Sequence, residues 1–234
     1  MTAALQVESL SGGYSKAPVL RDICLHVDAG EIVALFGANG AGKTTLMRGL
    51  CGALPVCRGT VVLEGRRIDR LPIWTRAQLG LAHAPEGRQV FASMTVGENL
   101  ETGALARKRS TAVEEVFALF PRLAEREHQR AGTLSGGEQQ MLAIGRALMS
   151  SPIVMLIDEM SAGLAPVVTE RLVESLTQIR DRGVAVILVE QAPQLVEDVI
   201  DRAYLVEQGR IMAEGSLAEL GGAAAIAELY LGVA

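Results

Sequence analysis

The sequence predicts an α/β fold with a largely parallel sheet. Short apolar runs rich in β-branched residues alternate with longer segments of helical periodicity, a pattern typical of strand–helix–strand units. The chain has 234 residues, of which 49% are hydrophobic, so one large folded unit can bury a substantial core. Its longest apolar runs are strand-sized, whereas a bilayer-spanning helix needs roughly 20 apolar residues.

Seven segments have the length and composition of buried strands. Each is a short apolar run bounded by turn residues or by a helical segment. The predicted strands are Leu5–Ser9, Ile32–Phe36, Val61–Leu63, Leu81–Ala84, Ile153–Ile157, Ala185–Val189 and Ala203–Glu207. After the last strand, Ser216 and Glu219 have the spacing of a capping box, which predicts that an alanine-rich C-terminal helix begins there.

The alternation of strands and helices stops between residues 100 and 150. Thr95 and Glu98 form another capping-box pattern, and the sequence that follows is helical as far as Ser150, with interruptions near Pro121 and Gly132. This segment therefore predicts a group of helices placed between two strands of the sheet.

We accordingly expect one compact unit with two lobes. Residues 1–94 and 151–234 form the core lobe, and residues 95–150 form a helical subdomain inserted into it. The sequence between the lobes has no repeat, low-complexity tract or obvious linker.

Charge and composition disfavour several classes of function. The 22 basic and 27 acidic residues give a net charge of −5, and the basic residues are scattered rather than gathered in the stripe that nucleic-acid-binding proteins show. Aromatic residues make up 3% of the chain, too few for a platform that stacks single-stranded bases. Three cysteines at spacings that fit no zinc or redox pattern indicate a reduced, cytosolic setting. Residues 1–6 lack the basic and apolar regions of a signal peptide.

A glycine-rich loop follows the predicted strand Ile32–Phe36. It matches the pattern G-x-x-x-x-G-K-[ST] in its proper place, between a strand and a helix. Backbone N–H groups of such a loop point inward and hold phosphate oxygens. Lys43 is expected to reach the β- and γ-phosphates, and the Thr44 hydroxyl to bind Mg²⁺ at the start of the helix. The predicted nucleotide-binding residues here are Gly37, Ala38, Asn39, Gly40, Ala41, Gly42, Lys43, Thr44 and Thr45.

Two carboxylates follow the predicted strand Ile153–Ile157. Asp158 ends this apolar strand, where a buried carboxylate is costly unless it meets a cation, so we expect it to contact Mg²⁺ directly or through water. Glu159 is then the predicted base that orients and polarises the attacking water. The alternative, that Glu159 is a solvated residue at a strand end, is disfavoured by the phosphate loop.

A second glycine motif precedes this strand, and it makes the prediction specific. It comprises Leu134, Ser135, Gly136, Gly137, Glu138 and Gln139. With it, nearly the whole chain resembles the ATP-binding cassette (ABC) ATPases, in which this signature motif opens a helix and binds the γ-phosphate of ATP held by the other protomer. The Ser135 hydroxyl, two glycine amides and a helix N-terminus form a reasonable anion site. The resemblance implies ATP and Mg²⁺ as cofactors and a head-to-tail dimer that sandwiches ATP.

The resemblance also implies a fold and further roles. The fold is that of a P-loop NTPase, with a RecA-like core sheet, an antiparallel β subdomain and an inserted α-helical subdomain. Tyr14 matches the aromatic residue that stacks on adenine, although a lone tyrosine could equally belong to the core. Glu86 stands where the family usually has the glutamine of the loop that joins the lobes, and it is a further candidate for the Mg²⁺ site. Gln191 stands where a histidine is usual, and Met160 replaces a proline that fixes φ.

One branch of the family matches more closely. Segments 85–100, 163–166 and 188–191 resemble the second of two ATPase subunits in importers of branched-chain amino acids, whose relatives carry urea, amides or aromatic acids. The partner ATPase of that branch keeps the histidine, which implies a heterodimer, with a homodimer as the alternative. The expected partners are transmembrane permease subunits, bound through residues 86–99, and indirectly a solute-binding protein. The expected location is peripheral, at the cytoplasmic face of the inner (plasma) membrane, with no nucleic acid bound.

Three other functions fit the sequence less well. A soluble ABC-type ATPase acting on ribosomes or DNA usually has tandem cassettes or a long coiled-coil insertion, for which this chain lacks the length. A regulatory cassette that binds ATP without hydrolysing it is disfavoured by Glu159. A GTPase would need an Asn-Lys-x-Asp guanine-recognition sequence, which the chain does not contain.

Overall fold

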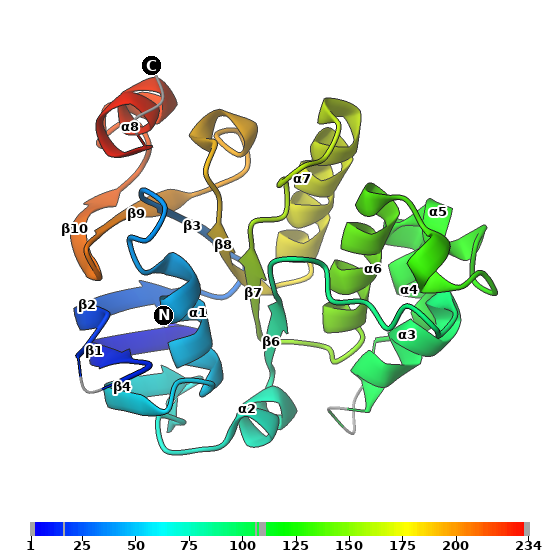
Figure 1. The fold of residues 1–234 in the computed structure, drawn as a ribbon, viewed down its shortest axis with the longest axis horizontal. Coiled ribbons are helices and arrows are strands. Elements are labelled where there is room, and N and C mark those ends of the chain that lie inside the picture. Colours follow the sequence, from blue (N-terminus) through cyan, green and yellow to red (C-terminus); the bar gives the residue numbers. More distant parts are fainter. Residues whose placement is uncertain (1–2, 16, 106, 108–110, 232–234) are drawn as a thin grey trace.

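The computed structural model describes residues 3–15, 17–105, 107 and 111–231, which form two sheets and a group of helices to one side (Figure 1). The smaller sheet is antiparallel, with strand order β2-β1-β4-β5, and the larger sheet has the order β10-β9-β3-β8-β7-β6. The strands are β1 (Leu5–Gly13), β2 (Leu20–Val27), β3 (Ile32–Phe36), β4 (Val56–Leu63), β5 (Arg66–Arg67), β6 (Leu81–Ala84), β7 (Val154–Asp158), β8 (Ala185–Val189), β9 (Arg202–Glu207) and β10 (Arg210–Gly215). In the larger sheet all neighbours are parallel except β10, which pairs antiparallel with β9.

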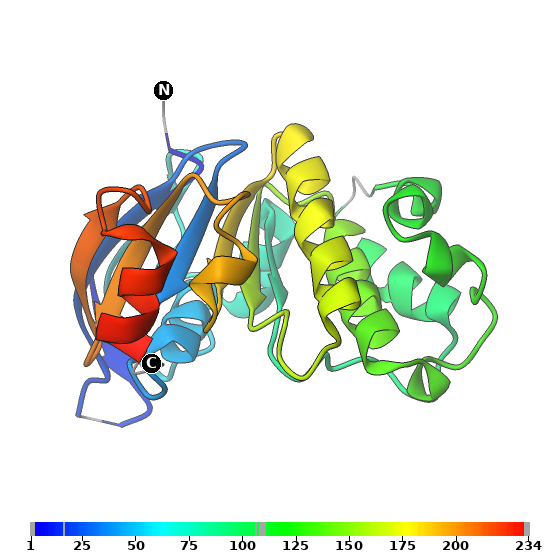
Figure 2. The same ribbon diagram turned by 90° about the horizontal axis from the view of Figure 1, so that it is seen from above.

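The helices divide between the sheets and the inserted segment. Helices α3 to α6 follow β6 and precede β7, and Figure 2 shows them on the far side of α7 from the two sheets. The helices are α1 (Lys43–Cys51), α2 (Ile73–Leu79), α3 (Val96–Ala104), α4 (Val113–Leu119), α5 (Pro121–Ala124), α6 (Gly136–Leu148), α7 (Pro166–Asp181) and α8 (Gly222–Leu231), with short 3-10 helices at Ala131–Thr133 and Pro193–Leu195.

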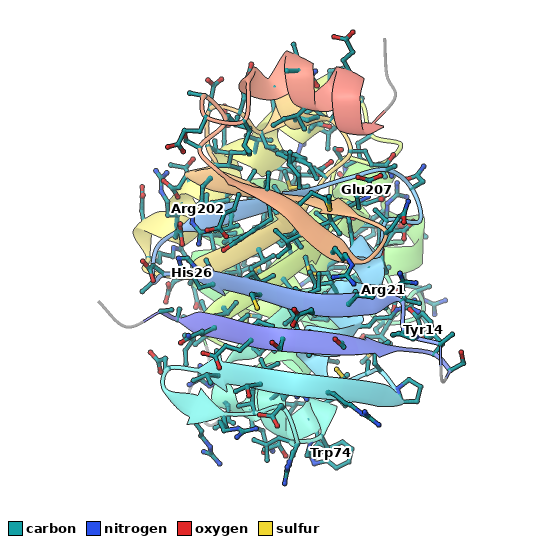
Figure 3. All side chains as sticks on the ribbon, turned by 90° about the vertical axis from the view of Figure 1, so that its left-hand side faces the viewer. Tyr14, Arg21, His26, Trp74, Arg202 and Glu207 are labelled. Atoms are coloured by element: carbon teal, nitrogen blue, oxygen red, sulfur yellow. The ribbon has the colours of Figure 1, made fainter. Side chains whose placement is uncertain are left out.

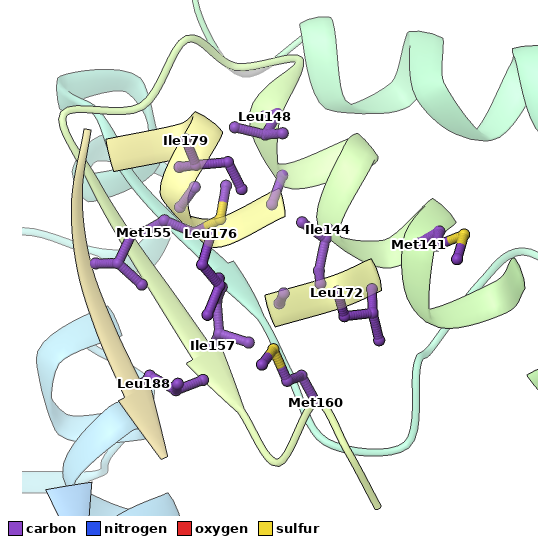
Figure 4. Packing of buried hydrophobic residues seen from close by; sticks show 14 of the residues in the cluster. Met141, Ile144, Leu148, Met155, Ile157, Met160, Leu172, Leu176, Ile179 and Leu188 are labelled. Atoms are coloured by element: carbon purple, nitrogen blue, oxygen red, sulfur yellow. The ribbon is translucent and has the colours of Figure 1, made fainter. Parts of the chain in front are cut away.

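The larger sheet lies between two hydrophobic cores. Strands β3, β7 and β8 are buried along their whole length, as expected for parallel strands that are covered on both faces. Their side chains alternate between a core shared with α1 and the antiparallel sheet and a core shared with α7 and the inserted helices. Figure 4 shows part of the second core, where Met160 lies beside Ile157 and Leu172.

The predicted fold class is confirmed, and all seven predicted strands are present. Most of the segment after Thr95 is helical, and its breaks at Phe120 and at the 3-10 helix Ala131–Thr133 lie near the predicted interruptions. A further break, between the end of α3 at Ala104 and the start of α4 at Val113, was not predicted. The Thr95 capping box forms, with the Glu98 amide donating to Thr95 Oγ1 at 3.1 Å. Strands β2, β5 and β10 were not predicted.

The predicted start of the C-terminal helix is wrong. The capping contacts exist, because Glu219 Oε2 accepts hydrogen bonds from Ser216 N and Oγ, both at 2.8 Å. Residues 216–221 nevertheless form turns, and α8 begins only at Gly222. Gly221 and Gly222 have φ of 91° and 88°, left-handed values that no right-handed helix can continue through.

Candidate nucleotide-binding site

The glycine loop between β3 and α1 is shaped by its backbone. A side chain at Gly37 would overlap the carbonyl oxygen of Val206 on β9, and Gly42 has a left-handed φ of 109° at the position before α1. No side chain caps the N-terminus of α1. Its first N–H groups are therefore available to an anion, as in phosphate loops.

The Lys43 side chain folds back over this loop. It is 5% exposed, and Nζ donates to Gly37 O at 2.6 Å and to Ala38 O at 3.1 Å. Burial lowers the pKa of the ammonium, while the nearby carboxylates of Glu159 and Asp158 oppose that shift. Two neutral carbonyl oxygens thus hold the cation at the mouth of the loop, where negatively charged phosphate oxygens would be better partners for it.

Asp158 is a buried carboxylate that lacks a cation. It is 1% exposed, and neither oxygen accepts a hydrogen bond of good geometry from a described residue, although the Thr44 hydroxyl is near enough to favour the ionised form. Its pKa is raised to about 6, mainly by burial and further by the charges of Glu159 and Glu86, while the Thr44 hydroxyl and the Lys43 charge act in the opposite direction. Because an orphaned carboxylate beside a hydroxyl suits a hard cation, these residues fit the predicted Mg²⁺ site.

The remaining ligands of such a cation cannot all come from the protein. Within the described ranges, no three acidic, histidine or cysteine side chains converge closely enough to hold a metal ion by themselves. Mg²⁺ is commonly bound by one or two carboxylates together with substrate phosphates and water. Thr44 and Asp158 would supply the protein ligands of an ion bound in this way.

Glu159 and Gln191 contact each other directly. Gln191 Nε2 donates to Glu159 Oε1 at 2.6 Å, and the Glu159 amide donates to Val189 O at 3.0 Å. Glu159 has a left-handed φ of 50°, which turns the chain sharply at the end of β7. The residue after it, Met160, is 1% exposed and contributes its side chain to the core, which explains an apolar residue in place of the family's proline.

Tyr14 lies at the surface and does not belong to the core. It is 51% exposed, its hydroxyl accepts a hydrogen bond from Arg48 Nη1 at 3.0 Å, and the guanidinium lies 5.8 Å from the ring centre. Figure 3 shows it at the end of the β1 ribbon. A cavity of about 420 Å³ brings Tyr14 together with Thr44, Glu86 and Asp158.

The second glycine motif opens α6. Ser135 caps this helix, accepting from the Glu138 amide at 3.4 Å, while Glu138 Oε2 accepts from Ser135 N at 2.9 Å and Oγ at 2.8 Å. Leu134 is buried, and Gln139 Nε2 donates to the Leu134 carbonyl at 3.3 Å. Figure 1 places α6 across β7 from α1, so the motif does not join the phosphate loop within one chain.

The glycines of this motif allow close approach. A side chain at Gly137 would overlap Val168 at the start of α7, and a Cβ at Gly136 would lie 2.8 Å from Arg88 Nη1. Arg88 therefore covers the start of α6 with a positive charge. Sequence reasoning missed this residue because only the tertiary structure places it there.

Comparison with known proteins agrees with this arrangement. The sequence profile of the ABC transporter family matches residues 20–162. The chain is 45% identical to the high-affinity branched-chain amino acid transport ATP-binding protein BraG of Pseudomonas aeruginosa, over 97% of this chain and 99% of that protein. It is 36% identical to the probable branched-chain amino acid transport ATP-binding protein LivF of Archaeoglobus fulgidus, over 92% and 93%, respectively.

Solved structures of ATP-binding cassettes have the same fold as this chain. A nucleotide-free ATP-binding cassette of an ABC transporter superposes with a TM-score of 0.82 at 26% identity, covering 92% of each chain. The ADP conformation of the cassette MJ1267 gives the same score and identity, covering 97% of this chain and 94% of that one. The chain therefore belongs to the ABC transporter family and is one of its ATP-binding subunits, which hydrolyse ATP.

Proposed function

We propose that this chain drives the import of branched-chain amino acids or a related small amphipathic solute. The observation that carries the proposal is the 45% identity, over nearly the full length of both chains, to a protein named for branched-chain amino acid transport. The pairing of Gln191 with Glu159 fits the same branch, in which glutamine replaces the usual histidine.

The site residues take the following roles. Residues 37–45 hold the phosphates, with Lys43 exchanging its two carbonyl contacts for phosphate oxygens. Thr44 and Asp158 hold Mg²⁺, with Glu86 at the edge of the same cavity, and the ion would neutralise charge on the phosphates. Glu159 acts as the base, and the Gln191 amide orients its carboxylate. Tyr14 stacks on the adenine.

A dimer completes the site. The motif at residues 134–139 of one protomer binds the γ-phosphate held by its partner, and residues 160–166 cross between them. ATP closes the dimer because it binds the closed state more tightly, and the helical subdomain (residues 95–150) moves relative to the core lobe. A neutral Gln191 cannot act as a protonatable phosphate contact, which favours a heterodimer with a histidine-bearing ATPase over a homodimer.

A groove beside the phosphate site suits the membrane subunits. It has a volume of about 420 Å³ and lies between α2, β6, α3 and α6. Ile73 and Phe91 line it and are 48% and 49% exposed. The Arg146 guanidinium lies 5.1 Å from the Phe91 ring centre, and its buried Nη1 has no hydrogen-bond partner among the described residues.

The charge of this groove defines its occupant. Its described lining residues include Arg76 and Arg146 but neither Asp nor Glu, in a chain whose net charge is −5. We infer an apolar helix that carries one carboxylate, namely a cytoplasmic helix of a permease subunit. No helix in the described ranges is long and apolar enough to cross a membrane, so docking in this groove would hold the chain at the cytoplasmic face of the inner membrane. A solute-binding protein would act through the permeases alone.

Affinity purification of the chain from its native membranes in mild detergent tests the proposal. We expect two multi-spanning permeases and a second ATPase with histidine at the position of Gln191. Arg146→Gln should reduce recovery of the permeases, whereas Met212→Ala should not, since Met212 is 55% exposed on β10 and does not line the groove. Recovery of ribosomes or DNA-repair factors instead would favour the soluble ATPase switch.

A further inference from the structure

Glu190 is a buried acid that the proposed chemistry leaves without a role. It follows β8 directly and is 1% exposed. No Lys, Arg or His of the described ranges forms an ion pair with it. Burial raises the pKa of its carboxyl, and the nearby charge of Glu159 raises it further. A carboxylate without a cation is costly at such a position, where an apolar side chain would ordinarily serve stability better.

Both oxygens of Glu190 are used on one residue. Oε1 accepts from the Ser161 amide at 3.0 Å, and Oε2 accepts from the Ser161 hydroxyl at 2.7 Å. Only a carboxylate offers two acceptor oxygens to the N–H and O–H of a single serine, because a glutamine amide has one oxygen. A glutamine could keep two contacts only by reversing one of them, with its Nε2 donating to the Ser161 hydroxyl, so the charge-assisted form of this two-point clamp is specific to the carboxylate.

The clamp joins two segments that carry the site. Ser161 is two residues after Glu159, and Glu190 is immediately before Gln191. Two further hydrogen bonds join the ends of β7 and β8. The Glu159 amide donates to Val189 O, and the Gln191 side chain donates to the Glu159 carboxylate. Ser161 also begins the turn that leads toward α7, since its carbonyl accepts from the Leu164 amide at 3.1 Å.

We propose that Glu190 is a positioning residue of the ATPase: by clamping Ser161 it holds the loop after Glu159 against the strand end that carries Gln191. The loop fixed in this way is the one expected to cross to the partner protomer. Contact with the partner is thereby coupled to the Glu159–Gln191 pair. The inference concerns ATP hydrolysis alone, so failure of the solute or permease assignment would leave it unchanged.

Steady-state hydrolysis of MgATP by the ATPase dimer that contains this chain gives the first test. Glu190→Gln and Ser161→Ala should each lower kcat about tenfold while KM stays within about twofold, because the phosphate loop is untouched. The double variant should be no slower than the slower single variant, since both remove one clamp. Ser175→Ala is the matched control: it removes another buried serine hydroxyl, which donates to Leu172 O at 2.6 Å within α7, and should leave kcat unchanged.

Stability and amide exchange separate positioning from a structural role. Glu190→Gln removes an unpaired buried charge, so its melting temperature should be unchanged or higher although kcat falls. In Glu190→Ala, amides of residues 160–166 should exchange at least about tenfold faster in the absence of nucleotide, with no change elsewhere in α7. The exchange test requires no turnover. Unchanged exchange, kcat within twofold in both single variants, or a parallel loss of kcat and melting temperature in Glu190→Gln would each overturn the proposal.

Discussion

At the residue scale, the described part of the chain buries two carboxylates, Asp158 and Glu190, that form no ion pair with another described residue. Burial raises the pKa of Asp158 to about 6 from 3.8 and also raises that of Glu190. Each shift means that the ionised form is disfavoured in the folded state. The nearby Thr44 hydroxyl and Lys43 ammonium partly offset the cost of ionising Asp158, and the Ser161 hydrogen bonds partly offset that cost at Glu190.

The shift at Asp158 predicts a pH-dependent gain in stability on substitution. The pKa of Asp158 is higher in the folded state than in the unfolded state, so its protonated form contributes to the free energy of unfolding at low pH. This contribution is lost as the pH rises from about 4 to about 6. Asp158→Asn should therefore raise the free energy of unfolding by about 1–3 kcal/mol above pH 6 and by nothing below pH 4. Urea unfolding without Mg²⁺ from pH 4 to pH 8 measures this difference. A difference that stays the same across that range would contradict it.

The pKa of His83 is shifted in the opposite direction, so a His83 variant serves as a control. Burial and the charge of Arg48 lower its pKa to about 4 from 6.5, so the native protein loses stability as the pH falls through that window. In the same titration, His83→Gln should remove this loss. The difference in free energy of unfolding between His83→Gln and the wild type should therefore increase as the pH falls. The corresponding difference for Asp158→Asn should disappear at low pH.

Glu159 should be needed for hydrolysis and not for binding. Because the Glu159 carboxylate is held by Gln191 beside Lys43, Glu159→Gln removes the base while leaving the phosphate loop intact. We expect kcat to fall by at least about 100-fold with ATP affinity within a few-fold, measured by turnover and by equilibrium binding. Glu170→Gln, an exposed carboxylate on α7, is the control. Undiminished hydrolysis by Glu159→Gln would mean that another group is the base.

At the element scale, the inserted helices pack through a glycine. A side chain at Gly103 on α3 would overlap the carbonyl oxygen of Arg146 on α6, so the two backbones touch there. Gly103→Ala should lower the free energy of unfolding by about 2–4 kcal/mol, since a backbone carbonyl cannot move aside easily. In Gly97→Ala, on the same helix, the added methyl group meets the flexible Glu127 side chain at 3.3 Å and the Glu127 carbonyl oxygen at an ordinary contact distance of 3.6 Å, so this variant should be nearly neutral. Equal effects in thermal or urea unfolding would contradict this account of the packing.

The elements that the sequence predicted are those whose signals are local. Buried parallel strands such as β7 are continuous apolar runs, and the phosphate loop is a contiguous motif. Strand β2 escaped prediction because exposed polar residues interrupt its buried ones. The Ser216 capping box gave a wrong helix start because Gly221 and Gly222, which have left-handed φ values, separate it from α8.

The contacts missing from the sequence prediction are tertiary. Glu190 meets Ser161 across 29 positions, Arg88 covers Gly136, and Arg146 stacks on Phe91. No spacing rule connects such pairs without an alignment or a fold. The sequence also left open whether Tyr14 lies in the core or at the surface, and only the structure shows that it is exposed.

At the scale of the whole molecule, the two glycine motifs lie in different parts of the fold. The phosphate loop belongs to the sheets and the signature motif to the inserted helices, with β7 and α7 between them (Figures 1 and 2). The head-to-tail dimer proposed above would bring the phosphate loop of one protomer against the signature motif of its partner. The groove lined by Ile73, Phe91 and Arg146 has walls formed by α2 and β6 on one side and by the inserted helices α3 and α6 on the other. A movement of the inserted helices relative to the sheet would therefore displace a helix bound in this groove.

The most direct test of transport is uptake by the assembled complex. The complex that co-purifies with this chain would be reconstituted in proteoliposomes with its solute-binding protein, and entry of labelled leucine, isoleucine and valine measured with and without MgATP. We predict uptake that requires MgATP and that falls at least about 100-fold when the chain carries Glu159→Gln. Uptake that persists in that variant, or an active complex that hydrolyses ATP without moving any of these amino acids or the related urea, amide and aromatic-acid solutes, would contradict the account.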